Sequence, residues 1–317
     1  MIRSSTVVQP KLELLPFDYR QGLFLIGSCF TEYIGERLSN AGLSVHMNPM
    51  GITYNPLSIK KSFEYLAGEH SLQDADFQQR DDVHFHWDFH SRFSKLDREP
   101  LKKECQESIV QAKRSIENSS LVIVSLGTAW IYELEADAQV VNNCHKMPND
   151  LFNKRLLSYN ELVSALSDIL DLLKLLSPEV RVLFTLSPVR HWKDGAEQNS
   201  LSKALLRSSI GAVTRKEQAL YFPSYEIMMD ELRDYRYYAS DLIHPSEIAQ
   251  EIIWERFKES IFTNKSLDYI QAVEAYQKMK SHRPILPDSQ GARAFAEKLK
   301  ETKRSILHTY PDSPFQG

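Results

Sequence analysis

A serine and an aspartate–histidine pair stand far apart in this sequence, in settings suited to acyl transfer. Ser28 follows the apolar run 23–26 and Gly27. Asp241 precedes His244 by three residues, so a single turn can bring the carboxylate beside the imidazole. A serine hydroxyl becomes a good nucleophile when a histidine removes its proton and a carboxylate orients that histidine. The three residues therefore predict a Ser–His–Asp hydrolase.

Each of the two signals also has a purely structural interpretation. Serine is a favoured first residue of a helix, so Ser28 alone could be an N-cap. Asp241 or Ser246 could likewise cap the helix that we expect to begin near Pro245. The co-occurrence of both motifs in one α/β pattern favours the catalytic interpretation.

Short apolar runs alternate with helical segments along most of the chain. Parallel strands that are covered on both faces are typically continuous apolar runs, and βαβ units produce this alternation. We therefore expect a doubly wound parallel α/β sheet with helices on both faces. The expected strands are 23–26, 43–45, 121–126, 180–186 and 219–222, and the expected helices are 31–40, 57–66, 102–117, 159–176, 225–232 and 245–262.

Ligands of such a sheet collect at the carboxyl ends of the strands. The segments expected there are Ser28, the loop 48–55, Gly127 with Thr128, 187–191 and 241–244. A serine at a strand-to-helix turn also has the N–H groups and positive potential of the helix N-terminus beside it, which stabilise an oxyanion.

Six short motifs resemble the GSCFA family of the SGNH/GDSL-like hydrolase superfamily. They are Gly27–Phe30, Asn48–Pro56, Leu126–Trp130, Asn143–Lys146, Ser187–His191 and Asp241–Pro245. The resemblance covers roughly residues 20–262. It implies a flavodoxin-like, three-layer SGNH-hydrolase fold and acyl-ester chemistry.

The resemblance also assigns roles. Ser28 would be the nucleophile and an oxyanion donor through its N–H, Gly51 would donate a second N–H, and the Asp–His pair would complete the triad. The third block departs from the superfamily pattern, because Ala129 stands where an asparagine donor is usual. Such a donor stabilises the transition state by about 3 kcal/mol. We expect Thr128 or Asn143 to replace it.

Histidines and an aspartate alternate with aromatic residues between His84 and His90. An extended strand would place His84, His86, Asp88 and His90 on one face and the aromatic residues on the other. A His-x-His pair is a plausible zinc chelate. The alternative is an inserted strand whose aromatic face packs down and whose polar face lines the cleft or solvent. Of these, we expect substrate contact through His86 rather than a metal.

Further candidates for substrate contact lie in the loops at the expected edge: Asn55, His145, Arg190 and His191. A guanidinium at Arg190 could clamp a carboxylate or sugar hydroxyls, or it could tie neighbouring loops together by an ion pair. The thiols Cys29 and Cys144 invite a cysteine mechanism, but small buried hydrophobes are the commoner role.

Composition restricts the class of protein and of partner. The chain has 317 residues, 42% of them hydrophobic and 25% charged, and a formal net charge of -4, which gives no reason to expect nucleic acid or an anionic membrane as partner. Three cysteines without pairing argue against a disulfide framework. We expect a cytoplasmic protein without cofactor or metal. The composition does not predict an oligomeric state. A hydrolase domain at 1–263 would precede a helical C-terminal extension at 264–317.

These observations predict hydrolysis of a small O-acyl ester, for example an O-acetyl group on a carbohydrate, through an acyl-enzyme on Ser28. Acyl transfer to a sugar hydroxyl is an alternative on the same fold. A non-catalytic carbohydrate-binding module is a third hypothesis, which the Ala129 departure keeps open.

Overall fold

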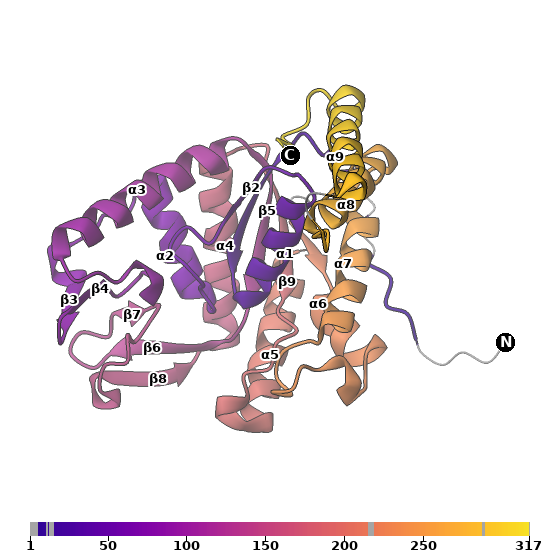
Figure 1. Cartoon of the computed structure of the whole chain (residues 1–317). Helices are drawn as coiled ribbons and strands as arrows, with labels where there is room; N and C mark the ends of the chain where they lie inside the picture. Colours follow the sequence, from indigo (N-terminus) through magenta and orange to yellow (C-terminus); the bar gives the residue numbers. More distant parts are fainter. Residues whose placement is uncertain (1–5, 11, 13–15, 215–218, 287–288, 317) are drawn as a thin grey trace.

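A five-stranded parallel sheet forms the centre of the molecule (Figure 1). The computed structural model describes residues 6–10, 12, 16–214, 219–286 and 289–316. The strands of the sheet lie in the order β10–β9–β5–β1–β2, the flavodoxin-like order for its first to fifth strand. Their bounds are β1 Gly22–Gly27, β2 Val45–Met47, β5 Ser119–Leu126, β9 Arg181–Leu186 and β10 Ala219–Phe222. The predicted doubly wound α/β fold is confirmed.

Helices cover both faces of the sheet, because every central strand is apolar on both sides. In β1, Leu23 and Leu25 belong to one buried cluster and Phe24 and Ile26 to the other. The first cluster includes α1 (Cys29–Asn40), α7 (Glu247–Ile261) and α8 (Asn264–Ser281). The second includes α2 (Pro56–Ala67), α3 (Arg98–Glu117), α4 (Tyr159–Leu176) and α5 (Gly195–Val213).

Around the main sheet, the clearest departures from the sequence expectation concern the second strand and two helices. The second strand begins at Val45 rather than Leu43, because the Leu43 N–H bonds back to the Leu38 carbonyl and closes α1. Helix α5 was not predicted at all. The expected helix at 225–232 is a short turn, α6 (Ser224–Glu226), which continues as a π-helical turn at Ile227–Glu231.

Two small antiparallel sheets are inserted between the units of the main sheet. One is the hairpin β3 (Phe77–Arg80) and β4 (Val83–His86), and the other has the order β7–β6–β8, formed by Val140–Val141, Trp130–Leu134 and Phe152–Leu156. Short 3-10 turns lie at Asp74–Asp76, Ser91–Phe93, Asn149–Leu151, Trp192–Asp194 and Tyr235–Tyr237.

The expected long strand through His90 is wrong, because β4 ends at His86. The chain turns there, with the Asp88 N–H donated to His86 Nδ1 and the Phe89 N–H to the His86 carbonyl. His86 and Asp88 are buried, so the polar side chains here do not line a solvent-facing surface.

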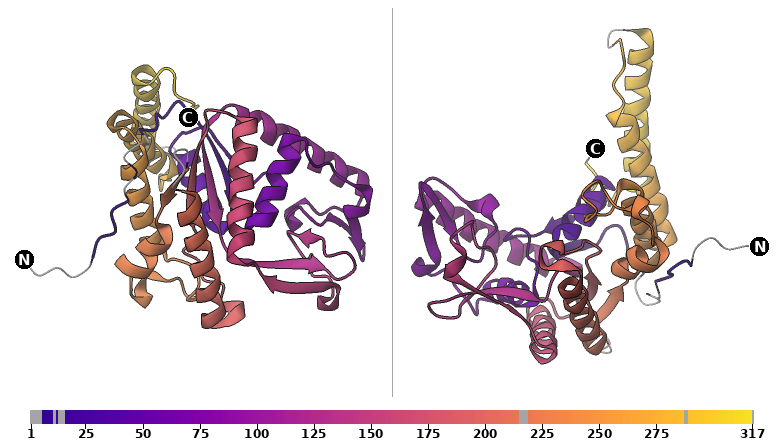
Figure 2. Two further views of the ribbon diagram at one scale, coloured as in Figure 1. Left: turned by 180° about the vertical axis from the view of Figure 1, so that it is seen from behind. Right: turned by 90° about the horizontal axis from the view of Figure 1, so that it is seen from below.

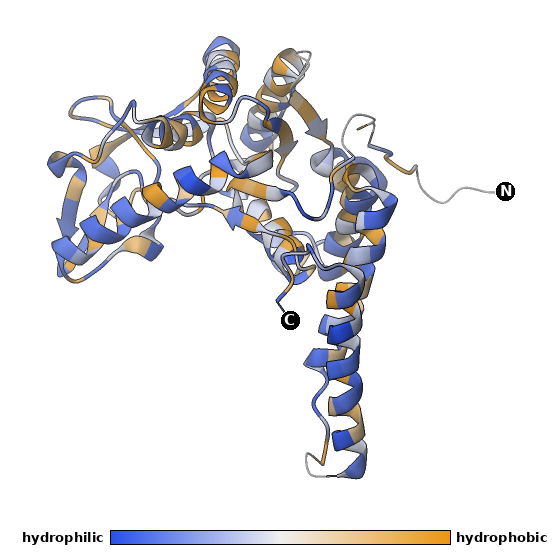
Figure 3. Ribbon diagram, turned by 90° about the horizontal axis from the view of Figure 1, so that it is seen from above, coloured by the Kyte–Doolittle hydropathy of each residue, from blue (hydrophilic) through white to orange (hydrophobic). Residues whose placement is uncertain are grey.

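The C-terminal helices pack onto the α1 side of the sheet. Thr263 caps α8, and Tyr269 of α8 donates a hydrogen bond to the Gly42 carbonyl at 2.7 Å and stacks on Tyr19. Helix α9 (Gln290–Thr309) runs back along α8 and the pair projects from the body of the molecule (Figure 2). Hydrophilic residues cover much of α9 (Figure 3). None of the described helices combines the length and apolar character that crossing a bilayer requires.

Candidate active site

Ser28 lies at the carboxyl end of β1, directly against the neighbouring strand β5. The chain reaches this position through Gly27, whose φ is +139°, and a Cβ there would lie 2.1 Å from the Ser125 carbonyl oxygen. Only glycine fits that approach. The Ser28 N–H donates to the same carbonyl at 3.0 Å, which fixes the serine at the start of α1.

The hydroxyl of Ser28 does not cap the helix that it begins. Ser28 is the N-cap residue of α1, yet its side chain makes no capping hydrogen bond. Its Oγ instead lies 2.9 Å from Ser125 Oγ, and the residue is 1% exposed. The simple N-cap interpretation therefore does not account for this side chain.

Asp241 and His244 form the pair that the sequence predicted. Asp241 Oδ2 accepts a hydrogen bond from His244 Nδ1 at 2.6 Å, and Oδ1 accepts the N–H groups of Ile243 and His244. The hydrogen bonds from the backbone and ring of His244 lower the pKa of Asp241 to about 2. Because Nδ1 carries the donated proton, Nε2 has its lone pair available for a proton from another group.

Arg190, after β9, holds the loop that carries this pair. Its N–H donates to the Ile243 carbonyl at 3.3 Å and its guanidinium to the Leu242 carbonyl at 3.1 Å. The guanidinium also lies over the rings of Trp192 and Tyr238. These contacts match the loop-tying alternative for Arg190, although through backbone carbonyls rather than an ion pair.

The Asp241–His244 loop is thus held against the segment after β9, and a Cβ on Gly127, after β5, would lie 3.4 Å from His191 Nε2 of that segment. Among the described residues, no hydrogen bond joins Ser28 directly to His244, and the partner of the Ser28 hydroxyl is Ser125 Oγ. His191, in the segment after β9, is partly buried, and its pKa is lowered to about 4, with burial the largest cause and Lys203 and His244 contributing. His191 is therefore neutral at pH 7 and leaves His244 as the more accessible base.

A buried lysine at this edge was missed by the sequence reasoning. Lys203 of α5 donates to the Gly127 carbonyl at 2.9 Å and to the Ser187 carbonyl at 2.8 Å, at the ends of β5 and β9. Burial lowers the pKa of Lys203 to about 7. A signal existed, because Lys203 falls on the apolar stripe of α5 with Leu206 and Ile210, where a charged residue is unusual.

All three predicted oxyanion donors are already engaged in this structure, the Ser28 N–H with the Ser125 carbonyl as described above. The Gly51 N–H donates to the Asn48 carbonyl at 2.8 Å, and the Thr128 N–H donates to the Tyr54 carbonyl at 3.1 Å. The backbone at position 51 nevertheless requires glycine, because its φ is +85° and a Cβ there would lie 2.1 Å from the His90 Cβ.

The segment Gly127–Trp130, where Ala129 replaces the usual asparagine, is hydrogen-bonded to α5. Ser202 Oγ accepts the Ala129 N–H at 2.8 Å and lies 3.2 Å from Thr128 Oγ1, which in turn accepts the Trp130 N–H. Ala129 is completely buried. A serine from α5 thus occupies the neighbourhood of the missing asparagine, and Asn143 lies with the hairpin pocket described below.

Two predicted substrate residues have other contacts. Asn55 is the N-cap of α2, where its Oδ1 accepts the Ser58 N–H at 2.9 Å and its Nδ2 donates to Ser58 Oγ. His86 is 1% exposed and lies within the hairpin insertion.

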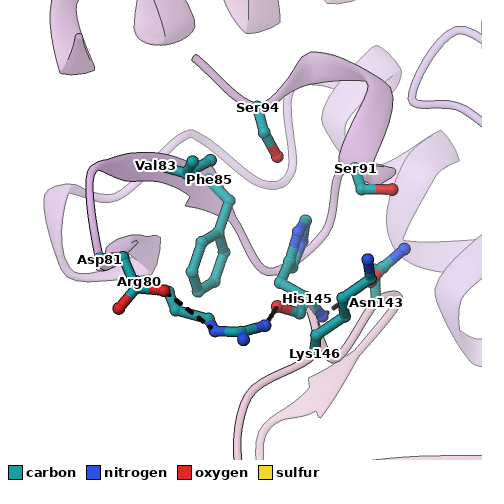
Figure 4. A pocket seen from close by; sticks show the side chains of 9 residues that line it. All are labelled: Arg80, Asp81, Val83, Phe85, Ser91, Ser94, Asn143, His145 and Lys146. Atoms are coloured by element: carbon teal, nitrogen blue, oxygen red, sulfur yellow. Dashed lines mark hydrogen bonds and ion pairs between the residues drawn. The ribbon is translucent and has the colours of Figure 1, made fainter. Parts of the chain in front are cut away.

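His145 lines a pocket of about 380 Å³ between the β3–β4 hairpin and the loop after β7 (Figure 4). Its ring stacks on Phe85, and Nε2 lies 3.0 Å from the His86 carbonyl oxygen. Burial lowers the pKa of His145 to about 4. Arg80 and Lys146 also line this pocket, so it offers a mixed aromatic and basic surface.

The thiols are not activated. Burial raises the pKa of Cys29, and it raises the pKa of Cys144 to about 11. Both are protonated thiols at neutral pH, whereas a nucleophilic cysteine needs a lowered pKa. The raised pKa values of both thiols thus argue against a cysteine nucleophile.

Residues 22–257 match the sequence model of the GSCFA family. This chain belongs to the GSCFA family. No curated protein gives a significant match.

Several solved structures resemble this GSCFA chain. One is an acetyl xylan esterase from Butyrivibrio proteoclasticus, at 13% identity and TM-score 0.41, covering 80% of this chain and 66% of that one. A family 3 carbohydrate esterase from Talaromyces cellulolyticus matches at 10% identity and TM-score 0.38, covering 79% and 98%. A family two carbohydrate esterase from Clostridium thermocellum matches at 11% identity and TM-score 0.38, covering 80% and 66%.

Proposed function

We propose that this protein is an SGNH-type serine esterase, with Ser28 as nucleophile, His244 as general base and Asp241 as the carboxylate that orients it. One observation carries the proposal. The Asp241–His244 pair is hydrogen-bonded at 2.6 Å with its second ring nitrogen free, in a loop anchored by Arg190 to the strand edge that holds Ser28. Membership of the GSCFA family supports it.

The chemistry is that of acyl-enzyme hydrolysis. The Ser28 hydroxyl would leave Ser125 by a change of rotamer and attack the ester carbonyl while its proton passes to His244 Nε2. The protonated His244 then returns that proton to the leaving alcohol. Water repeats the sequence on the acyl-enzyme and releases the acid, so the reaction needs no cofactor.

Stabilisation of the oxyanion falls to the N-terminus of α1. The N–H groups of Ser28, Gly51 and Thr128 donate to backbone carbonyls, and the Thr31 N–H donates to the Ser28 carbonyl. We therefore assign the oxyanion to the N–H groups of Cys29 and Phe30, the first two residues of α1. Gly51 or Thr128 contributes only if substrate displaces those bonds. A less complete oxyanion hole predicts slow turnover relative to enzymes with three free donors.

The surroundings favour a small acyl group on a polyol. Ser28 is 1% exposed, so little space surrounds its hydroxyl. Trp192, which is 45% exposed, lies against Arg190 beside the His244 loop, and an exposed indole of this kind stacks on sugar rings. We therefore propose O-acetylated carbohydrate as the substrate class.

Labelling with a fluorophosphonate, followed by peptide mapping, tests the assignment. We expect the probe on Ser28 and no labelling in Ser28→Ala. Ser209→Ala is the matched control, because Ser209 is equally buried but donates to the Leu205 carbonyl within α5. Labelling of Cys29 would transfer the role to a thiol, and a folded protein that never labels would favour a binding module.

A further inference from the structure

A second group of histidines and aspartates lies away from the sheet edge, beneath the β3–β4 hairpin. It consists of His70 after α2, Asp76 in the turn before β3, His86 at the end of β4 and Asp88 in the turn that follows. One donor atom each from His70, Asp76 and Asp88 lies within 4.8 Å of the other two. His86 Nε2 lies 4.0 Å from Asp76 Oδ2.

The two carboxylates of this group are unequally neutralised. Asp88 accepts hydrogen bonds from Tyr65 at 2.8 Å and forms an ion pair with Lys61 at 2.8 Å. Asp76 is 6% exposed, and the interaction found for its Oδ1 is a hydrogen bond from the Gln139 amide. Among the described residues, no cationic group comes closer to Asp76 than His86 at 4.0 Å. A buried carboxylate without a nearby positive charge lowers the stability of the folded protein, so a cation is expected beside it.

Two imidazole nitrogens at the same place lack partners. Nε2 of His86 is buried, in a residue that is 1% exposed, and makes no hydrogen bond. Nε2 of His70 is also buried and unpartnered. Buried polar atoms are nearly always satisfied, so a pair of orphans beside an unneutralised carboxylate indicates a missing occupant rather than two unrelated defects.

The two histidines have different roles toward such an occupant. The Asp88 N–H donates to His86 Nδ1 at 3.1 Å, so in neutral His86 the proton is on Nε2, which is then a donor. His70 is free to present the lone pair of Nε2. His70 is therefore a ligand, and His86 donates a hydrogen bond to a liganding carboxylate or to bound water, as outer-shell groups of metal sites do.

We propose that His70, Asp76 and Asp88 bind one zinc ion, with water completing the coordination and His86 orienting the site. An imidazole with two carboxylates selects a transition metal over Ca²⁺ or Mg²⁺, which prefer all-oxygen shells. Tetrahedral zinc bonds of about 2.0–2.2 Å place donor atoms about 3.3–3.6 Å apart, so donors now within 4.8 Å of one another would have to move closer by side-chain rotation. The half-buried His70 provides the entry side.

The ion would fasten the hairpin to the end of α2. His70 is held at that end by its N–H bond to the Glu64 carbonyl, and Asp76 and His86 flank the hairpin. The His86 carbonyl also lies within hydrogen-bond reach of His145 in the neighbouring pocket. The role is structural and does not depend on the chemistry proposed for Ser28.

The test is calorimetric titration of Zn²⁺ into chelator-treated, full-length protein, with thermal unfolding measured in parallel. We expect one equivalent bound and a higher Tm with zinc. His70→Ala and Asp76→Asn should each weaken binding by at least about tenfold and abolish the rise in Tm. His84→Ala, two residues from His86 on the same strand, is the matched control and should behave as wild type.

Asp76→Asn also separates the metal from the simpler alternative of a proton on His86. If zinc is the missing charge, the metal-free Asp76→Asn protein should be at least as stable as metal-free wild type, since an unneutralised carboxylate has been removed. A less stable metal-free Asp76→Asn protein, no zinc binding by wild type, or equal loss of binding in His84→Ala would overturn the proposal.

Discussion

Two aspartate–histidine clusters in this protein contain the same functional groups in opposite environments. Asp241 and His244 are about half exposed and satisfy each other through a 2.6 Å hydrogen bond. Asp76 and His86 are buried and remain 4.0 Å apart. The comparison shows that a complete pair at the surface leaves one nitrogen ready to move protons, whereas an incomplete pair in the interior calls for another charge.

The largest effect should come from removing the base of the exposed cluster. We expect His244→Ala to lower kcat/KM for p-nitrophenyl acetate by about 10⁴-fold, because members of a triad act as a unit. Its Tm should stay within about 2 °C of wild type, since the side chain is half exposed. His282→Ala, an exposed histidine on the C-terminal side, is the control. Near-native turnover in His244→Ala would contradict the role of His244 as general base.

Asp241→Asn should have a smaller effect of the same kind, a loss of about 10²-fold in kcat. The amide can still face the ring but no longer stabilises the imidazolium. Because hydrogen bonds lower the pKa of Asp241 to about 2, the carboxylate stays ionised as pH falls through the ordinary range of aspartate. A kcat–pH profile of wild type should therefore show no loss from Asp241 until about pH 2. If kcat of the wild type fell with a midpoint near pH 4, and that of Asp241→Asn did not, the hydrogen bonds from His244 to Asp241 would be weak.

Lys203 extends the comparison to a buried charge at the sheet edge. Since burial lowers its pKa to about 7, the unfolded chain holds more protons than the folded one between about pH 7 and pH 10.4. This contribution makes the free energy of unfolding rise with pH between about pH 7 and pH 10.4. Below pH 7 the folded protein carries the full cost of burying a protonated Lys203. In Lys203→Met the rise should disappear, so the Tm difference, variant minus wild type, should fall by several degrees from about pH 6.5 to pH 9.5.

Lys298→Met, on the exposed face of α9, controls for the loss of a positive charge. A Tm difference that does not change with pH would show that Lys203 keeps an ordinary pKa in the folded protein.

The smallest effect is expected at Asn55, which distinguishes a capping residue from a binding residue. Asn55→Ala removes the acceptor for the Ser58 N–H, so it should cost about 1 kcal/mol and lower Tm by about 2 °C. KM should not change, and a matched Asn55→Asp variant should restore Tm because aspartate also caps. A raised KM with unchanged Tm would instead return Asn55 to the substrate site.

Much of this could be predicted because it is encoded locally. The apolar run before Gly27 and the three-residue spacing of Asp241 and His244 were sufficient to predict the sheet edge and the hydrogen-bonded pair. Asn55 before Pro56 is an N-cap followed by a helix-starting proline, a signal that was present in the sequence.

The remainder depends on contacts between distant segments. The position of Lys203 on the apolar stripe of α5 indicates that it is buried, but the carbonyls it binds follow two different strands and could not be predicted from spacing. His86 was predicted to contact substrate, but it is buried and its Nε2 lies 4.0 Å from Asp76 Oδ2, because the turn after β4 folds this side chain inward. Spacing along one strand could not reveal that arrangement.

Rapid-quench mass spectrometry during turnover of p-nitrophenyl acetate is the most direct test of Ser28 as the nucleophile. We expect one acetyl group per chain on the peptide that contains Ser28, formed before steady state. It should be absent from Ser28→Ala and formed far more slowly in His244→Ala. Acetylation of Cys29 or Lys203 instead, or turnover with no acetyl group on the protein, would contradict this role of Ser28.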